Sequence, residues 1–383
     1  MHDKFTLSIK FFQGFLCEFF VVDKKESIEV IMMLVAGNLM GFYNPNQLAD
    51  YLGINKKQLY KHIKDLSVYQ WKRMLMIIGC QQALPLIRDA LSKSASTQSR
   101  RCITLSVDDT VIKRIGQILS YTYSWYSGQY NHVVNGQNII AITIKIGKIT
   151  IPLNIRPVSK QGRANTEKPE LLKTMLREVI SFFSDQGIDL TQFPITFDSW
   201  YGSQPLREIL EEFGFNDILV DTKSDYVFSI DNQKDKMRNH KKQTELKEAW
   251  GCDVEVSRKV GISPTFGEVV LLFFADGARK RCMMSFSSLR ACEILRIWRQ
   301  HHGIERFWRC LKHLLGLSKM SLHGRCGAYA GIGVKLLSYL MGLSLSNELK
   351  TTFHQLKVLI RREIAPSEFF SEHFHLEDWV NAS

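Results

Sequence analysis

Closely spaced cysteines are missing from this chain. Its 8 cysteines are scattered, and no two of them form a CxxC pair. Structural zinc sites are commonly built on such pairs, so the sequence argues against one. The N-terminus also lacks the pattern of a secretory signal peptide. We therefore expect free thiols and a cytoplasmic protein.

Apolar runs long enough to span a membrane are lacking as well. The run over 30–40 is about 11 residues long, whereas a membrane-spanning helix needs about 20. The run over 328–343 contains Lys335. We expect both runs to be buried core helices, and we expect no membrane partner. With 383 residues and 45% hydrophobic residues, the chain is predicted to form two or three folded parts with real cores.

Acidic residues are scarce in one segment. From Arg279 to Arg325 there are eleven Lys or Arg residues and only two acids, Glu293 and Glu305. The formal net charge of the whole chain is +12, so this segment supplies much of the surplus. Charge concentrated in this way is typical of a binding face for a polyanion. Nucleic acid is the first candidate, and an anionic membrane surface is the second.

Residues 1–95 are predicted to form a helical DNA-binding domain. Near 44–66 the spacing is that of a helix-turn-helix, with Ala49 where two helices cross and Gly53 in the turn. The alternative is an ordinary two-helix hairpin. The outer face of the second helix would carry side chains that reach phosphates or base edges, namely Lys56, Lys57, Tyr60, Lys61 and Lys64.

The rest of the chain alternates between strand and helix patterns, which predicts an α/β fold. A polar linker over 94–101 precedes a catalytic core formed by 102–222 and 288–316. Residues 223–287 contain a charged stretch and antiparallel strand patterns, so we expect a β-rich insertion that interrupts the core. Residues 317–383 are predicted to form a helical C-terminal region.

Three carboxylates lie where such a core can bring them together. Asp109 lies in ITLSVDDT, Asp198 lies in FPITFDSW, and Glu305 lies in the basic helical segment WRQHHGIERFWRCLK. Acids at neighbouring strand ends and on a flanking helix can hold two Mg²⁺ ions, with Mn²⁺ as a possible substitute. Such ions activate an oxygen nucleophile and stabilise the leaving 3′ oxygen of a phosphodiester. The acids therefore predict a metal-dependent enzyme that acts on nucleic acid.

This pattern resembles that of DDE transposases of bacterial insertion sequences, over about residues 102–316. It is most similar to the branch with a Tyr, Arg, Glu, Lys signature. Glu305 and Lys312 match the signature at its spacing, whereas Trp298 stands at the Tyr position and His301 at the Arg position. The resemblance implies a ribonuclease H-like mixed-sheet core, metal-dependent cleavage at insertion-sequence ends and strand transfer into target DNA.

The resemblance also implies roles for single residues. In this family the first acid commonly stands directly before Thr, which selects Asp109 over Asp108, although strand alternation leaves both open. Lys312 would contact terminal phosphates, and Arg299 or Arg306 would compensate for the missing Arg at position 301. The full set of expected DNA-binding residues is Lys312, Trp298, His301, Arg299, Arg306, Arg309, Lys160, Arg163, Lys56 and Lys57.

Double-stranded DNA is the expected partner, and the family implies a homodimer that grips two element ends. Three alternatives stay open. The first is a domesticated relative that binds DNA without cutting it, and the second is a nuclease of the same fold that only hydrolyses. The third is a helix-turn-helix regulator with a large partner domain, which leaves the three acids unexplained.

Overall fold

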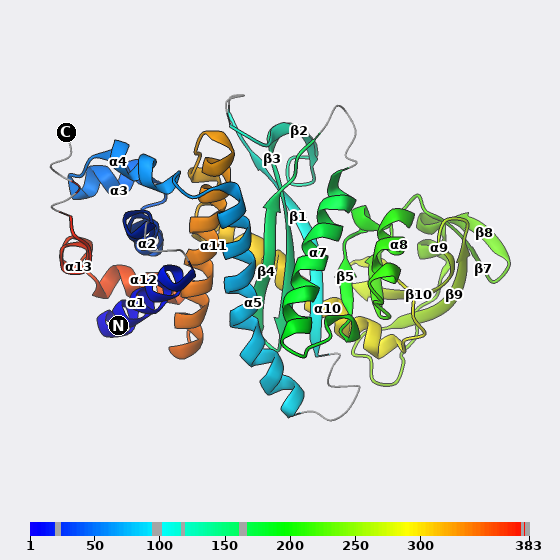
Figure 1. The fold of residues 1–383 in the computed structure, drawn as a ribbon. Helices are drawn as coiled ribbons and strands as arrows, with labels where there is room; N and C mark the ends of the chain where they lie inside the picture. The colour runs from blue at the N-terminus through cyan, green and yellow to red at the C-terminus, as the bar shows by residue number, and fades with distance from the viewer. Residues whose placement is uncertain (20–23, 94–101, 116–118, 161–166, 377–378, 380–383) are drawn as a thin grey trace.

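The computed structural model describes residues 1–19, 24–93, 102–115, 119–160, 167–376 and 379. The predicted linker over 94–101 and Arg163 lie outside these residues. The prediction of an α/β protein is confirmed, because one mixed sheet runs through the molecule with helices on both of its faces (Figure 1).

The 11 strands of the sheet follow the order β2-β3-β1-β5-β6-β11-β10-β9-β7-β8, and β4 also pairs with β3. Strand β1 is parallel to β5 and antiparallel to β3, while β5 is parallel to β6. The first six strands are β1 (Ile103–Lys113), β2 (Thr122–Ser127), β3 (His132–Ile146), β4 (Ile149–Pro157), β5 (Ile195–Phe197) and β6 (Ile218–Asp221).

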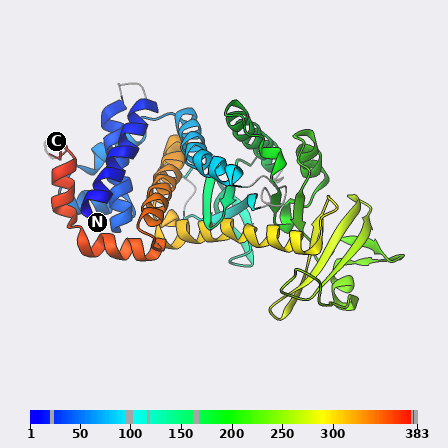
Figure 2. The same ribbon diagram turned by 90° about the horizontal axis from the view of Figure 1, so that it is seen from below.

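Helices cover this part of the sheet on both sides. Helices α5 (Val68–Ser92) and α7 (Glu167–Asp185) lie over one face, and α10 (Ala291–Arg309) crosses the other (Figure 2). Burial on both faces explains why β3 has a continuous buried run over 139–144 and no polar alternation there. A short helix, α8 (Gln204–Glu212), connects β5 to β6.

The predicted β-rich insertion extends the main sheet. Its last strand pairs antiparallel with β6, so the core and the insertion share one continuous sheet. Its strands lie on the right of Figure 1. The elements of this part are β7 (Val227–Ile230), β8 (Gln233–Lys236), α9 (Met237–Gln243), β9 (Val256–Ser263), β10 (Gly267–Asp276) and β11 (Arg279–Ser285).

The predicted helix-turn-helix geometry is present in α3 (Pro45–Leu52) and α4 (Lys56–Ile63). Gly53 adopts a φ of 67° in the turn, a conformation that glycine takes at little cost. The Asn55 side chain accepts a hydrogen bond from the Lys57 N–H at 2.9 Å, which starts the second helix. The apolar face of α4 is buried, and its outer face exposes Lys56, Lys57, Lys61 and Lys64.

The N- and C-terminal helices pack together into one bundle beside the sheet (Figure 1). Helix α11 of this bundle also packs against α5. Gly333 of α11 permits the contact with α5, because an added Cβ would lie 2.2 Å from the ring of Trp71. The bundle contains α1 (His2–Phe19), α2 (Lys25–Met40), α11 (Gly324–Glu348), α12 (Phe353–Glu363) and α13 (Pro366–His373).

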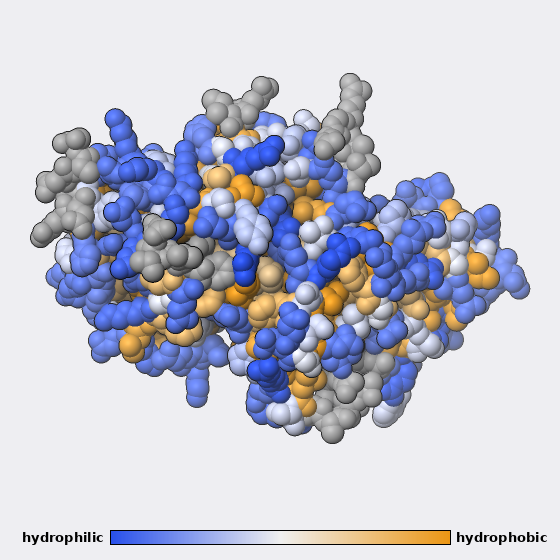
Figure 3. Space-filling view, in the orientation of Figure 1, coloured by the Kyte–Doolittle hydropathy of each residue, from blue (hydrophilic) through white to orange (hydrophobic). Residues whose placement is uncertain are grey.

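Among the described residues, two helices, α5 and α11, are long and apolar enough to cross a membrane by length and composition alone, contrary to the expectation that no such run is present. The bent pair α2–α3 would be a third if it formed one span. The most apolar window of α11 is 89% buried inside the protein, and that of α5 is 39% buried. The predicted burial of the runs over 30–40 and 328–343 is confirmed. Polar residues cover most of the face drawn in Figure 3, with apolar residues in smaller patches. This arrangement is compatible with a soluble protein.

Candidate active site

On the side of the sheet that α10 covers, side chains of β1, β5 and α10 contact one another in sequence. The Ser106 hydroxyl on β1 lies 2.9 Å from the Thr196 hydroxyl on β5. Thr196 Oγ1 in turn lies 2.9 Å from Nδ1 of His301 on α10. Side chains alternate along a strand, so Asp108, two residues after Ser106, points to this same side.

Glu305 belongs to the same face of α10 as His301, because residues four apart on a helix are neighbours. Its side chain is 47% exposed. Nδ1 of His302 lies 3.1 Å from Glu305 Oε2, and this hydrogen bond is the main reason that the pKa of Glu305 is lowered. Glu305 is therefore an ionised carboxylate at neutral pH.

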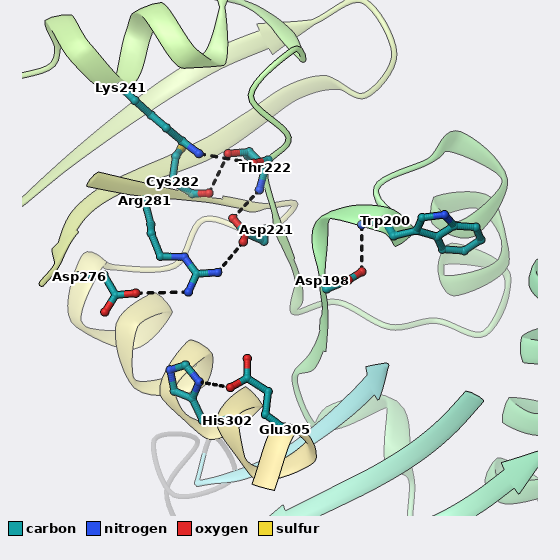
Figure 4. A network of polar contacts seen from close by, with 10 residues as sticks. All are labelled: Asp198, Trp200, Asp221, Thr222, Lys241, Asp276, Arg281, Cys282, His302 and Glu305. Atoms are coloured by element: carbon teal, nitrogen blue, oxygen red, sulfur yellow. Dashed lines mark hydrogen bonds and ion pairs between the residues drawn. The ribbon is translucent and has the colours of Figure 1, made fainter. Parts of the chain in front are cut away.

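Asp198 directly follows β5, as predicted from its short apolar strand. Its Oδ1 accepts a hydrogen bond of 2.9 Å from the Trp200 N–H, which forms the turn η3 (Ser199–Tyr201). Figure 4 shows Asp198 at the strand end and Glu305 on α10 below it. Burial raises the pKa of Asp198 to about 6, and the negative charge of Asp109 contributes to this rise.

Asp108 lies among other carboxylates, and its electrostatic environment reflects this. Its pKa is raised well above the ordinary value, first by burial and then by the charges of Asp198 and Asp109. Glu305 adds a smaller repulsion in the same direction. Asp108 thus lies within electrostatic range of every other carboxylate in the group. A divalent cation relieves repulsion of this kind, and such clusters are typical of functional sites.

Asp109, the sequence-based choice of first acid, occupies a different environment from Asp108. As the next residue in β1, it points to the opposite side of the sheet, toward α7. Asp109 Oδ2 accepts from Lys168 Nζ at 2.9 Å and from Asn138 Nδ2 at 2.5 Å, and Oδ1 accepts from the Tyr201 hydroxyl at 2.9 Å. Both carboxylate oxygens are thus occupied by donors of this chain. Both acids of the pair stay open as the first ligand: Asp108 lies on the side of the sheet that α10 covers, whereas Asp109 lines a cavity together with Asp198.

Trp298 and His301 require a correction. They are only 3% and 2% exposed, and their rings stack with centroids 4.6 Å apart. Burial lowers the pKa of His301 to about 4, so its imidazole is neutral at physiological pH. In this structure neither side chain is positioned to contact DNA, contrary to the prediction. Both residues dock α10 onto the sheet.

The remaining basic residues lie around this site or along α10. Lys312, half-buried in the π-helical turn Cys310–Leu314, is close enough to Asp108 and Asp109 for their charges to act on its pKa. Arg306 and Arg309 are exposed, while Arg299 forms an ion pair of 2.5 Å with Asp253. Lys160 donates to the Ser124 carbonyl at 3.2 Å, and its ammonium lies 5.2 Å from the Trp125 ring centroid.

A cavity of about 550 Å³ is lined by two of the carboxylates, Asp109 and Asp198, and Asp108 and Glu305 are not among its lining residues. Its wall combines acids, lysines and aromatic rings, a composition suited to a charged ligand with planar groups. The side chains that characterise it are Asp109, Asp198, Lys168, Lys223, Lys312, Trp125, Tyr126 and Trp200.

No protein-family model and no curated protein matches this chain. The chemistry of the site is therefore the main guide to function. Sequence reasoning missed Lys168, Asn138 and Trp125 as parts of the site, whereas Trp200 and Tyr201 could be noticed because they directly follow Asp198. No short motif marks the three that were missed, because they meet only through the pairing of β3 with β1 and the packing of α7.

The donor set of the carboxylate site fits a hard divalent cation, since Asp108, Asp198 and Glu305 supply oxygen ligands. Among the described residues, one group places three possible ligand atoms within 4.8 Å of one another, namely His2, Glu372 and His373 between α1 and α13. The three carboxylates are spread more widely.

Proposed function

We propose that this protein is a metal-dependent DNA transposase that cleaves at the ends of an insertion sequence and joins the freed ends to target DNA. The observation that carries the proposal is the convergence of Asp108, Asp198 and Glu305. They come from two parallel strands and from the helix that crosses them, and Lys312 lies beside them. In this proposal Asp108 replaces Asp109 in the acidic triad.

The strand arrangement supports a ribonuclease H-like core. Strands β4, β3, β1, β5 and β6 lie side by side, and only β3 runs against the other four. The first acid lies on the central strand β1, the second follows its parallel neighbour β5, and the third lies on a helix across the sheet. This order of strands and acids is what a ribonuclease H-like nucleic-acid enzyme requires.

The three carboxylates would hold two Mg²⁺ ions, or Mn²⁺ in their place, and these ions would supply the activated oxygen nucleophile and stabilise the leaving 3′ oxygen. The protein's own residues would do the rest. Lys312 would bind the phosphate next to the cleaved bond. The exposed arginines Arg306 and Arg309 on α10, and Lys56 and Lys57 on α4, would hold the DNA backbone further away.

Double-stranded DNA is accordingly the proposed partner, and cytoplasmic localisation follows from that partner. We further propose that two copies act together on a pair of element ends, since joining both ends to one target requires two active sites. Lys56 and Lys57 lie on the outer face of a helix-turn-helix, which suits recognition of the element end in the major groove.

The proposal is tested by assaying cleavage and joining on DNA that carries the ends of the element encoding this chain. We expect activity with Mg²⁺ or Mn²⁺ in the intact protein. Asp108→Asn, Asp198→Asn and Glu305→Gln should each lower the rate about 1000-fold or more, because several kcal/mol of transition-state stabilisation is lost. Asp185→Asn, at an exposed position at the end of α7, is the matched control and should leave the rate unchanged.

Other outcomes would point to the alternative functions. Cleavage without joining would identify a nuclease that only hydrolyses. Binding of the ends without cleavage under any metal would identify a DNA-binding relative without catalytic activity. Loss of activity in Asp109→Asn with full activity in Asp108→Asn would overturn the choice of first acid.

A further inference from the structure

Lys168 is a buried cation beside the carboxylate site, and none of the roles described above belongs to it. It lies in the first turn of α7 and is only 3% exposed. Its ammonium is 2.9 Å from Asp109 Oδ2. A buried lysine is costly unless a charge or strong acceptors compensate it, so the pairing with Asp109 explains why the ammonium can be held there.

The Asp109 carboxylate holds Lys168 within a network of fixed partners. Asn138 of β3 and Tyr201 of the η3 turn donate to the same carboxylate. Tyr201 belongs to the turn that begins at Asp198, so Asp109 links the position of Lys168 to that of a proposed metal ligand. With its oxygens occupied in this way, Asp109 is placed to orient neighbouring groups.

The Lys168 ammonium faces the cavity as well as Asp109. It lies 3.9 Å from the ring centroid of Trp200 and 5.7 Å from that of Trp125, two aromatic faces that favour a cation. It lines the cavity together with Asp198. Its positive charge also acts to lower the pKa of Asp198, which shows that the two groups are within electrostatic range.

We propose that Lys168 is a catalytic residue that contacts a phosphate of the reacting DNA strand, and that Asp109 is a positioning residue that holds it. This inference rests on the proposed function. An ammonium has three donors, and Asp109 uses only part of that capacity, so a phosphate oxygen in the cavity can take another. A compact point charge beside the metal ligands suits a phosphate whose negative charge grows during the reaction.

Lys168 should also affect metal binding in the absence of DNA. A fixed positive charge beside Asp198 repels a divalent cation, so it weakens metal binding by the free protein. Removing that charge should strengthen metal binding while it slows cleavage. A residue that only maintained the fold would shift both properties in the same direction.

The first measurement is the affinity of the free, full-length protein for Mn²⁺ by calorimetry. We expect Lys168→Met to bind Mn²⁺ more tightly, by on the order of fivefold, because one nearby positive charge is gone. Lys168→Arg should keep the affinity of the intact protein. Lys173→Met is the control, since Lys173 lies on the same helix but pairs with Glu212 at 2.6 Å.

The second measurement is single-turnover cleavage at saturating Mn²⁺. Lys168→Met should be slower by about 100-fold, the usual effect of losing one donor to developing charge. Lys168→Met leaves Asp109 buried without its cation and could fold poorly, so the double variant Asp109→Asn/Lys168→Met removes both charges together. We expect this double variant to bind Mn²⁺ within about twofold of the intact protein and still to cleave about 100-fold more slowly.

Unchanged metal affinity and unchanged cleavage in both variants would overturn the role of Lys168. Parallel losses of affinity, cleavage and melting temperature would overturn it too, because they mark a structural residue. An intact protein that cleaves no DNA would overturn the proposed function instead. In that case tighter Mn²⁺ binding with weaker Mn²⁺-dependent DNA binding in Lys168→Met would still support the contact, and unchanged binding would refute it.

Discussion

Asp108 and Asp109 are neighbours in β1, yet replacing each of them by asparagine should change stability in opposite directions. Asp108→Asn removes a carboxylate whose pKa is raised by burial and by neighbouring carboxylates, although Lys312 lies within electrostatic range of it. Asp109→Asn removes the charge that balances Lys168. Asparagine is almost the same size as aspartate, so both effects on stability should be mainly electrostatic.

The gain expected from Asp108→Asn follows from its raised pKa. A carboxyl group whose pKa is higher in the folded state destabilises that state at every pH above its unfolded value, whether it stays ionised or takes up a proton. At an effective dielectric constant of about 20, one like charge about 8 Å away costs about 2 kcal/mol. We therefore expect Asp108→Asn to stabilise the protein by about 2 kcal/mol in EDTA at pH 8.

The loss expected from Asp109→Asn follows from the burial of its partner. Lys168 and Asp109 have side chains that are 4% and 13% exposed. Breaking a buried ion pair by removing one partner costs about 3–5 kcal/mol. The Asn oxygen still accepts from Tyr201, so we expect the lower end, about 3 kcal/mol.

The assay is the melting temperature of each variant in EDTA and in Mg²⁺. With an unfolding entropy of about 2.1 cal/mol/K per residue, 1 kcal/mol shifts the Tm of a chain this long by about 1 °C. Asp108→Asn should melt about 2 °C higher than the intact protein in EDTA and lose the stabilisation by Mg²⁺. Asp109→Asn should melt about 3 °C lower and keep the response to Mg²⁺. Loss of the Mg²⁺ response in Asp109→Asn alone would refute the assignment of the two acids.

Three further predictions concern other parts of the molecule. Burial lowers the pKa of His301 to about 4, against about 6.5 in the unfolded chain, so the free energy of unfolding should fall by up to about 3 kcal/mol as pH drops from 6.5 to 4. In urea denaturation at several pH values, His301→Gln should flatten this pH dependence. An unchanged slope would contradict the neutral imidazole. Gly333→Ala should destabilise by about 1–3 kcal/mol through a clash with the indole of α5, whereas Gly331→Ala, whose Cβ would come no closer than 3.4 Å to another atom, should be neutral or stabilising in the same denaturation experiment. Replacing Lys56 and Lys57 by Ala should make the salt dependence of DNA binding shallower by about 0.9 logarithmic units for each phosphate that is no longer neutralised; fluorescence anisotropy at several salt concentrations measures this slope, and an unchanged slope would place the DNA elsewhere.

Local interactions determined much of this fold in advance. The turn between α3 and α4 could be predicted because Gly53 and Asn55 act on the backbone within a few residues of themselves. The short strand before Asp198 could be predicted from the mostly apolar run FPITF that precedes this acid. The alternation of side chains in β1 could also have indicated which acid faces α10. Thr104, Ser106 and Asp108 are two residues apart and point to one side of the sheet, whereas Asp109 points to the other.

The misplaced side chains of α10 have a different cause. The spacing of Trp298, His301 and Glu305 correctly predicts one stripe along a helix. It does not say which part of that stripe lies on the sheet. In the structure the same stripe that carries Glu305 to the strand ends buries Trp298 and His301 against the sheet, where the imidazole meets Thr196 of β5.

The sequence by itself thus determined the helices and strands, the basic outer face of α4 and the three segments that supply carboxylates, because periodicity, capping and charge are properties of neighbouring residues. Only the tertiary structure decided that Asp108 lies on the side of the sheet covered by α10, that Asp109 holds Lys168 and that the insertion joins the main sheet through β11 and β6. Each of these depends on contacts between residues far apart in the chain. Such contacts are set by strand pairing and by which helix covers which face, and no local pattern contains that information.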